Sequence, residues 1–183
     1  LENFQYGLID HFIGKRLEEN ERFLNLFAYT GAASSVARKK GAETLHVDSV
    51  KQLIAWGREN MELSELENIK WVHEDALKFA QREVKRNKIY KGIVMDPPAW
   101  GIGAKKEKWK LEDRLDELIG NAAKLIGKDG FLVLNTYSPK VEIKTIEQLA
   151  KRHLNRREYE VSELWMKTTT GKDLYYGNLL RVI

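Results

Sequence analysis

The sequence contains no cysteine, which excludes disulfide bonds, thiolate metal sites and cysteine nucleophiles. No apolar run approaches the roughly 18 residues that a membrane-spanning helix needs, so we expect no membrane partner. Neither a signal peptide nor a low-complexity segment is visible. Together these absences predict a cytoplasmic protein in a reducing environment.

The net charge of the chain says little about its binding partners. Its 183 residues include 31 Lys and Arg against 27 Asp and Glu, a net charge of +4. A basic surface attracts polyanions, but an excess this small is only weak support for a nucleic-acid partner. The chain begins at Leu1 rather than at a methionine, which is consistent with a fragment that lacks an N-terminal substrate-recognition domain.

Short apolar runs alternate with longer segments of helical periodicity. The expected strands are Phe23–Phe27, Thr44–Asp48, Ile69–His73, Ile89–Met95, Phe131–Thr136, Tyr159–Met166 and Leu174–Val182. One amphipathic helix is expected before the first strand (residues 4–17), and one in each of the five gaps between the first six strands. Asp129–Gly130 is expected to form a turn.

This alternation predicts an α/β fold, a doubly wound, Rossmann-like sheet covered on both faces. The last two strands have no helix between them and must form a hairpin. We therefore expect seven strands, mostly parallel, with the last one antiparallel.

Ligands bind such sheets at the carboxyl ends of the strands. The loop after the first strand, Asn25–Ala33, is rich in small residues, which let the backbone approach a ligand at a helix N-terminus. A simple tight turn is the alternative. The loop has neither the G-x-G-x-x-G pattern of dinucleotide sites nor the G-K-[ST] of a P-loop, which argues against NAD and ATP.

Acidic residues follow the second and third strands. Asp48 can accept hydrogen bonds from both ribose hydroxyls of a nucleoside, or it can cap the next helix. Asp75 can accept from an adenine amino group, and it too can cap a helix. The sequence leaves both alternatives open for Asp75.

The fourth strand ends at Asp96-Pro97-Pro98-Ala99-Trp100. Paired prolines hold the chain extended and present Asp96 as a fixed acceptor, while Trp100 offers a face on which a flipped-out base can stack. The alternative is a rigid strand exit with a core tryptophan.

In this order and spacing, the four segments resemble motifs I to IV of class I S-adenosylmethionine (SAM)-dependent methyltransferases. The sequences of three segments are similar to those of bacterial large-subunit rRNA methyltransferases that modify cytosine C5 or guanine N7. These segments are Leu24–Gly31, Val47-Asp48 and Met95–Pro98. The resemblance runs from about Phe23 to the C-terminus. It implies a catalytic domain over residues 23–183, preceded by a helical lead-in over residues 1–22.

The resemblance also implies which residues form the site. The cofactor SAM would be held by Asn25, Phe27, Ala28, Tyr29, Thr30, Gly31, Asp48, Ser49, Asp75, Ala76 and Asp96. The acceptor would meet Asp96, Pro97, Pro98 and Trp100, the expected catalytic residues.

Two departures from the family narrow the chemistry. The fifth strand leads into Asn135–Pro139 where a cysteine nucleophile is expected, so a covalent cysteine mechanism is excluded. Ala99 stands where amino-group methyltransferases carry an aromatic residue. We therefore expect direct SN2 transfer to a ring nitrogen of an RNA base, with rRNA as the partner. The alternatives are a small-molecule or protein methyltransferase, a non-catalytic RNA-binding module, and a Rossmann oxidoreductase, which the missing glycine fingerprint disfavours.

Beyond the acceptor motif, lysines are interleaved with a tryptophan in a loop. The expected RNA-binding residues there are Lys105, Lys106, Lys108 and Trp109. A solvated charged loop is the alternative. The four histidines show no metal-ligand spacing, so we expect no metal, and His46 and His73 should be structural.

Overall fold

The structure is a computed structural model, and it describes residues 11–102, 108–168 and 170–183. Seven strands form the central sheet: β1 (Arg22–Leu26), β2 (Glu43–Asp48), β3 (Lys70–His73), β4 (Tyr90–Met95), β7 (Ile126–Thr136), β8 (Tyr159–Lys167) and β9 (Asp173–Val182). Their order is β3-β2-β1-β4-β7-β9-β8. Only β9 runs antiparallel to its neighbours, β7 and β8, so the predicted sheet is confirmed.

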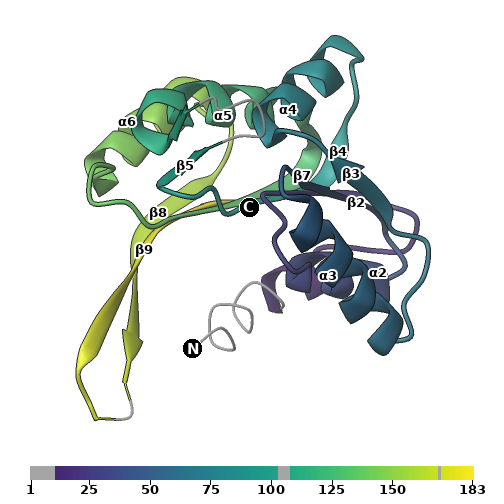
Figure 1. The fold of residues 1–183 in the computed structure, drawn as a ribbon. Coiled ribbons are helices and arrows are strands. Elements are labelled where there is room, and N and C mark those ends of the chain that lie inside the picture. The colour runs from purple at the N-terminus through teal and green to yellow at the C-terminus, as the bar shows by residue number, and fades with distance from the viewer. Residues whose placement is uncertain (1–10, 103–107, 169) are drawn as a thin grey trace.

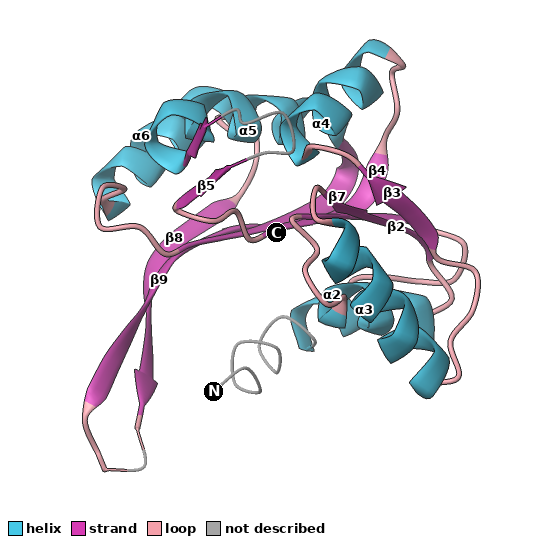
Figure 2. Cartoon of the chain, in the orientation of Figure 1, coloured by secondary structure: helices cyan, strands magenta, loops and turns pink. Residues whose placement is uncertain are grey.

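Helices cover both faces of this sheet (Figures 1 and 2). On one side lie α2 (Ala32–Lys39) and α3 (Lys51–Leu63). On the other side lie α4 (Ala76–Lys85), α5 (Leu111–Leu125) and α6 (Ile143–His153). The lead-in helix is described only from residue 11, where its last turn precedes β1; the rest of that prediction lies outside the described residues. No described helix is long and apolar enough to cross a membrane.

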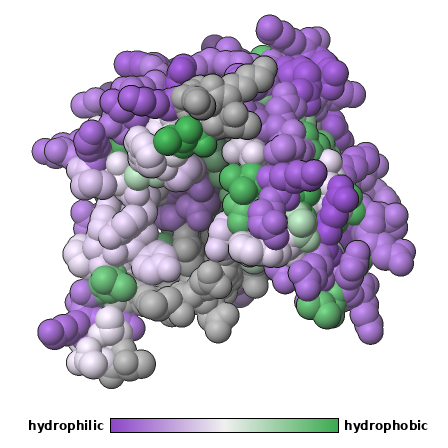
Figure 3. Space-filling view, in the orientation of Figure 1, coloured by the Kyte–Doolittle hydropathy of each residue, from purple (hydrophilic) through white to green (hydrophobic). Residues whose placement is uncertain are grey.

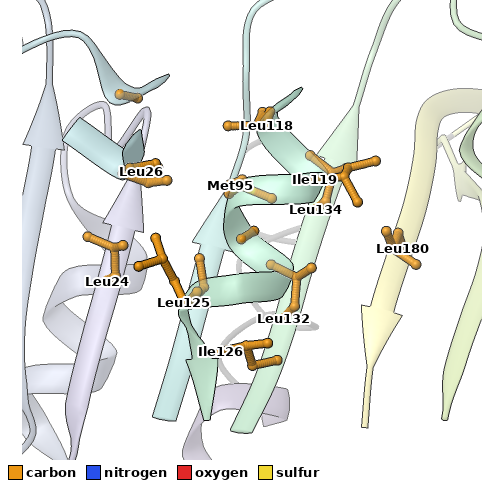
Figure 4. Packing of buried hydrophobic residues seen from close by; sticks show 14 of the residues in the cluster. Leu24, Leu26, Met95, Leu118, Ile119, Leu125, Ile126, Leu132, Leu134 and Leu180 are labelled. Atoms are coloured by element: carbon orange, nitrogen blue, oxygen red, sulfur yellow. The ribbon is translucent and has the colours of Figure 1, made fainter. Parts of the chain in front are cut away.

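The apolar pattern of the strands explains this layering. Along β1, Phe23 joins the core on the α2 side, whereas Leu24 and Leu26 join the core under α4–α6. In β7, Leu132 and Leu134 face α5, as Figure 4 shows from close by. Successive side chains of a strand point to opposite faces, so nearly continuous apolar strands build two cores.

Two predicted boundaries are wrong. The segment after the prolines was expected to be a loop, but β5 (Trp100–Ile102) and β6 (Lys108–Lys110) form a two-stranded antiparallel sheet. Strands of three residues are too short to show a pattern in the sequence. In addition, β7 begins at Ile126 rather than Phe131.

The Asp129–Gly130 segment lies in a bulge of β7 rather than in a turn before it. Tyr90 of β4 pairs with Ile126, and Gly92 pairs with Phe131, so the residues between bulge out. The guanidinium of Arg157 donates to the carbonyl oxygens of Ile126, Gly127 and Lys128 at 2.7–3.0 Å. These bonds satisfy carbonyls that the bulge removes from the ladder.

The β8–β9 hairpin extends well beyond the sheet (Figure 1). The pairing of β9 with β7 ends at Thr136 and Asn178, and the outer part of β9 pairs with β8. The hairpin leaves the sheet at Gly177, where φ is +117°. A Cβ at Gly177 would lie 2.3 Å from the carbonyl oxygen of Thr136, so only glycine fits here.

Candidate functional site

The four predicted motifs follow β1, β2, β3 and β4, which are neighbours in the sheet. Because these strands are parallel, the loops that follow them meet at one edge. The strand order reverses between β1 and β4, the place where ligands bind doubly wound sheets. The face seen in Figure 3 is hollowed between the α4–α6 side and the α2–α3 side.

The loop after β1 has an unusual backbone. Phe27, Tyr29 and Gly31 all have positive φ, at 56°, 49° and 92°. Gly31 is the N-cap residue of α2, and no side chain caps the first amides of this helix. The tight loop therefore leaves the positive end of α2 open toward the edge of the sheet.

A buried polar network supports this loop from below. Nδ2 of Asn25 donates to Oγ of Ser34 at 3.0 Å, and Oγ of Ser34 lies 3.1 Å from Nδ1 of His46. Burial lowers the pKa of His46 to about 4, so the ring is neutral. Asn25 was predicted to hold the cofactor. Its side chain is buried and contacts Ser34 of α2 at the start of this loop's helix, and its role toward the cofactor stays a prediction.

The carboxylate of Asp48 ties two of the motif loops together. Its Oδ2 accepts from the backbone N–H of Tyr29 at 3.0 Å, and its Oδ1 accepts from Val50 N–H at 2.9 Å. Burial raises the pKa of Asp48, and these backbone donors act in the opposite direction. The bond to Val50 fits the capping alternative, yet a carboxylate oxygen can accept from more than one donor.

The third loop is organised by Asp75. Its Oδ1 accepts from the backbone N–H of Lys78 at 2.9 Å, so Asp75 caps α4. Ala76 is buried directly behind it. In the neighbouring loop Ser49 is exposed, and its carbonyl oxygen lies 3.0 Å from Nε2 of His73. The capping alternative for Asp75 is present, and its second oxygen is left for another donor.

Asp96 leaves β4 opposite the end of β7. Its Oδ1 accepts a hydrogen bond of 3.0 Å from Nδ2 of Asn135. Asp96 itself is open to solvent, whereas Asn135 is 3% exposed. The protein around the carboxyl group raises the pKa of Asp96 through desolvation, and the Asn135 bond lowers it. Beyond Asp96, Pro97 is buried, Pro98 is exposed, and the ring of Trp100 is exposed rather than in the core.

The β5–β6 sheet joins the acceptor motif to the first loop. Nε1 of Trp109 donates to the carbonyl oxygen of Pro98 at 2.7 Å, and its ring packs on Phe27 with centroids 5.2 Å apart. Trp109 is therefore occupied by protein contacts, which argues against the predicted stacking of this ring on a base. Lys108 is exposed, and Lys105 and Lys106 lie outside the described residues.

Sequence reasoning missed the role of Asn135. A polar residue at the end of an otherwise apolar strand was the available signal, because such a position faces the ligand edge. The partnership of Ser34 with His46 gave no signal, since each residue is unremarkable in its own segment. Among the described residues, no group of three or more His, Asp or Glu side chains could hold a metal ion.

The chain matches one protein family over residues 9–166, the family described as conserved hypothetical protein 95. It is 30% identical over 179 residues to the ribosomal RNA large subunit methyltransferase K/L of Syntrophotalea carbinolica, covering 87% of this chain and 24% of that protein. The chain thus spans about a fifth to a quarter of the curated relatives that it matches.

The chain also resembles solved structures of methyltransferases. The SAM-dependent methyltransferase from Agrobacterium tumefaciens superposes with a TM-score of 0.86 and 31% identity, over 97% of this chain and 60% of that one. SMU.776, solved in complex with SAH, superposes with a TM-score of 0.78 over 96% of this chain and 48% of its own. At 17% identity, the second likeness concerns the fold alone.

Proposed function

Because the chain belongs to the conserved hypothetical protein 95 family and has the class I SAM-dependent methyltransferase fold, we propose that it transfers a methyl group from SAM to a base of RNA, with rRNA as the natural acceptor. The observation that carries the proposal is the pairing of Asp96 with Asn135 beside the Asp48 loop. The rRNA methyltransferase among the relatives supports RNA as the acceptor class.

The residues at the edge of the sheet fit SAM. Asp48 offers two carboxylate oxygens that are fixed by the amides of Tyr29 and Val50, which suits the two hydroxyls of a ribose. Gly31 brings the backbone and the open end of α2 to the same place. Asp75 keeps one oxygen for an adenine amino group, and Ser49 and Ala76 border this part of the site.

When bound, SAM supplies a methyl group made electrophilic by its sulfonium, which a base nitrogen can accept with its own lone pair by direct SN2 displacement. The chain then has to align the acceptor and exclude water. Asp96 accepts a hydrogen bond from the base and favours the positive charge that develops on it. Pro97 and Pro98 keep the Asp96 backbone rigid, and the exposed face of Trp100 stacks on the base.

Asp96→Ala tests this proposal. Transfer of a labelled methyl group from SAM to RNA should fall by at least a hundredfold, on the scale of losing a charged transition-state contact. SAM affinity measured by calorimetry should stay within a few fold. Asp113→Ala, which removes an exposed carboxylate of α5, is the matched control and should keep both.

Loss of transfer and of SAM affinity together in Asp96→Ala would assign Asp96 to cofactor binding or to structure. A wild-type chain that binds SAM and methylates a small molecule or a protein, but no RNA, would overturn the proposed acceptor class. The cofactor assignment would survive that second result.

A further inference from the structure

The protruding hairpin carries a row of aromatic rings that starts at the candidate site. Tyr137 follows β7 directly, two residues after Asn135, the partner of Asp96. The Tyr137 ring lies 6.2 Å from that of Tyr175 on β9, which in turn lies 5.2 Å from that of Trp165 on β8. We call Tyr137, Tyr175 and Trp165 the aromatic row.

The outer rings of the row are unusually exposed for their size, 62% for Tyr137 and 51% for Trp165. Tyr175 lies half-buried between them and keeps the row continuous. Nε1 of Trp165 donates to Oε2 of Glu163 at 2.9 Å, which fixes the indole in place. Exposed apolar surface that gathers in one place commonly marks a binding site.

We propose that the aromatic row binds the single-stranded RNA next to the acceptor base, by stacking of unpaired bases on Tyr137 and Trp165. This inference rests on the proposed function, because it takes RNA as the substrate. It extends the binding surface from the acceptor motif along the hairpin, to a place that no sequence motif indicated.

The chemistry of the hairpin favours a single strand over other partners. Every base has a face that can stack on an aromatic ring, whereas the bases of a duplex are already stacked on one another. The rings follow one another along the hairpin and have charged neighbours such as Glu163, unlike the apolar core of a protein interface. Lys167 and Lys172 lie at its outer end, where they can meet phosphates, while Asp173 pairs across from Lys167.

The position of the hairpin also suits the binding of an RNA strand next to the Asp96 site. Beyond Thr136 and Asn178 its two strands pair with each other rather than with β7, so the outer part of the hairpin stands clear of the sheet (Figure 1). An RNA strand whose base enters the Asp96 site would continue over Tyr137 first. Trp165 would meet a nucleotide farther along the strand.

The test compares Trp165→Ala with Trp56→Ala, which removes another exposed tryptophan, 46% accessible and on α3. Affinity for a short fluorescein-labelled single-stranded RNA of mixed sequence is measured by fluorescence anisotropy. We expect Trp165→Ala to weaken binding about tenfold, since stacking on one ring is worth about that factor. Trp165→Phe should retain most of the affinity, and Trp56→Ala and the affinity of every variant for SAM should not change.

Equal RNA affinity of Trp165→Ala and the wild type would overturn the inference, as would a wild-type chain that binds no single-stranded RNA. If labelled-methyl transfer to RNA persists under either result, the proposed function stands without the aromatic row. If Trp165→Ala instead turns a dimer into a monomer in light scattering with RNA affinity unchanged, the row is an interface between copies. RNA binding through Trp165 without any Asp96-dependent transfer would refute the proposed function alone.

Discussion

Asn135 holds the carboxylate of Asp96 from the neighbouring strand, with Nδ2 donating to Oδ1 at 3.0 Å. The two residues are 39 positions apart in the sequence and meet because β4 and β7 pair in parallel. The amide is buried whereas the carboxylate reaches solvent, so the fixed partner orients the accessible one. This makes Asn135 a positioning residue for the acceptor site.

Removing this partner should move the pH profile of methyl transfer. Desolvation by the surrounding protein raises the pKa of Asp96, although the residue is exposed at the surface, and the Asn135 bond lowers it. In Asn135→Ala only the raising effect remains. If transfer requires the carboxylate, its acidic limb should shift to higher pH. Separately, loss of the bond that orients the carboxylate should lower transfer at neutral pH roughly tenfold. Asn121→Ala, which removes a similar amide that bonds to Glu117 within α5, should leave the profile unchanged. A loss of transfer with an unmoved limb would mean that Asn135 acts on stability alone.

Asp48 and Asp75 should respond differently to the same substitution. Both oxygens of Asp48 accept backbone N–H groups, so Asp48→Asn would turn an NH2 toward the amide of Tyr29 or of Val50. We expect SAM affinity to fall about tenfold or more, because a buried mismatch costs one to three kcal/mol. Asp75→Asn keeps an oxygen that can cap α4, since asparagine caps as well as aspartate does, but it turns an NH2 toward the adenine amino group. SAM affinity should therefore fall several fold, less than in Asp48→Asn because Asp75 is only half-buried. Normal SAM titration of Asp48→Asn in the calorimeter would remove Asp48 from the cofactor site.

Much of the fold was predictable because its signals are local. Buried strands such as β7 contain continuous apolar runs (Phe131–Leu134), and helices such as α5 repeat their apolar residues every three or four positions. The absence of a helical segment between β8 and β9 likewise predicts a hairpin, and hence the antiparallel strand. Placement of the motif loops at one edge then follows from parallel strands alone.

The contacts between distant segments were not predictable from local pattern. The Asn135–Asp96 bond depends on β4 lying beside β7, and strand order leaves no periodic signature in a sequence. Trp109 was predicted, with the neighbouring lysines, to bind RNA from a loop, whereas β5–β6 pairing places its ring on Phe27. The half-buried position of this ring depends on a tertiary contact, which the composition of the segment does not indicate.

The stability of the protein should fall in mild acid through His46. Its folded pKa of about 4 lies below the usual value of 6.5, because burial outweighs a backbone hydrogen bond with Tyr29. Because the folded pKa is lowered, neutral His46 makes its full contribution to the free energy of unfolding above pH 6.5. That contribution, up to about 3 kcal/mol, is lost as the pH falls toward 4. Urea unfolding between pH 7.5 and 4.5 measures this slope, and His46→Leu should flatten it, whatever the loss of the Ser34 contact does at neutral pH. An equally steep slope in the variant would assign the acid sensitivity to other groups.

Gly177 should be far less replaceable than Gly171, although both have positive φ, at 117° and 79°. At Gly171 a Cβ would meet nothing within 4 Å, so Gly171→Ala should cost only the backbone strain, about 1 kcal/mol. At Gly177 the Cβ would lie 2.3 Å from the carbonyl oxygen of Thr136, where β9 leaves β7, and backbone cannot move aside as a side chain can. Gly177→Ala should therefore lower the free energy of unfolding by at least about 2 kcal/mol more than Gly171→Ala in parallel urea titrations. Similar losses in the two variants would show that the hairpin can leave the sheet by another path, and that its position relative to Asp96 is not fixed by this glycine.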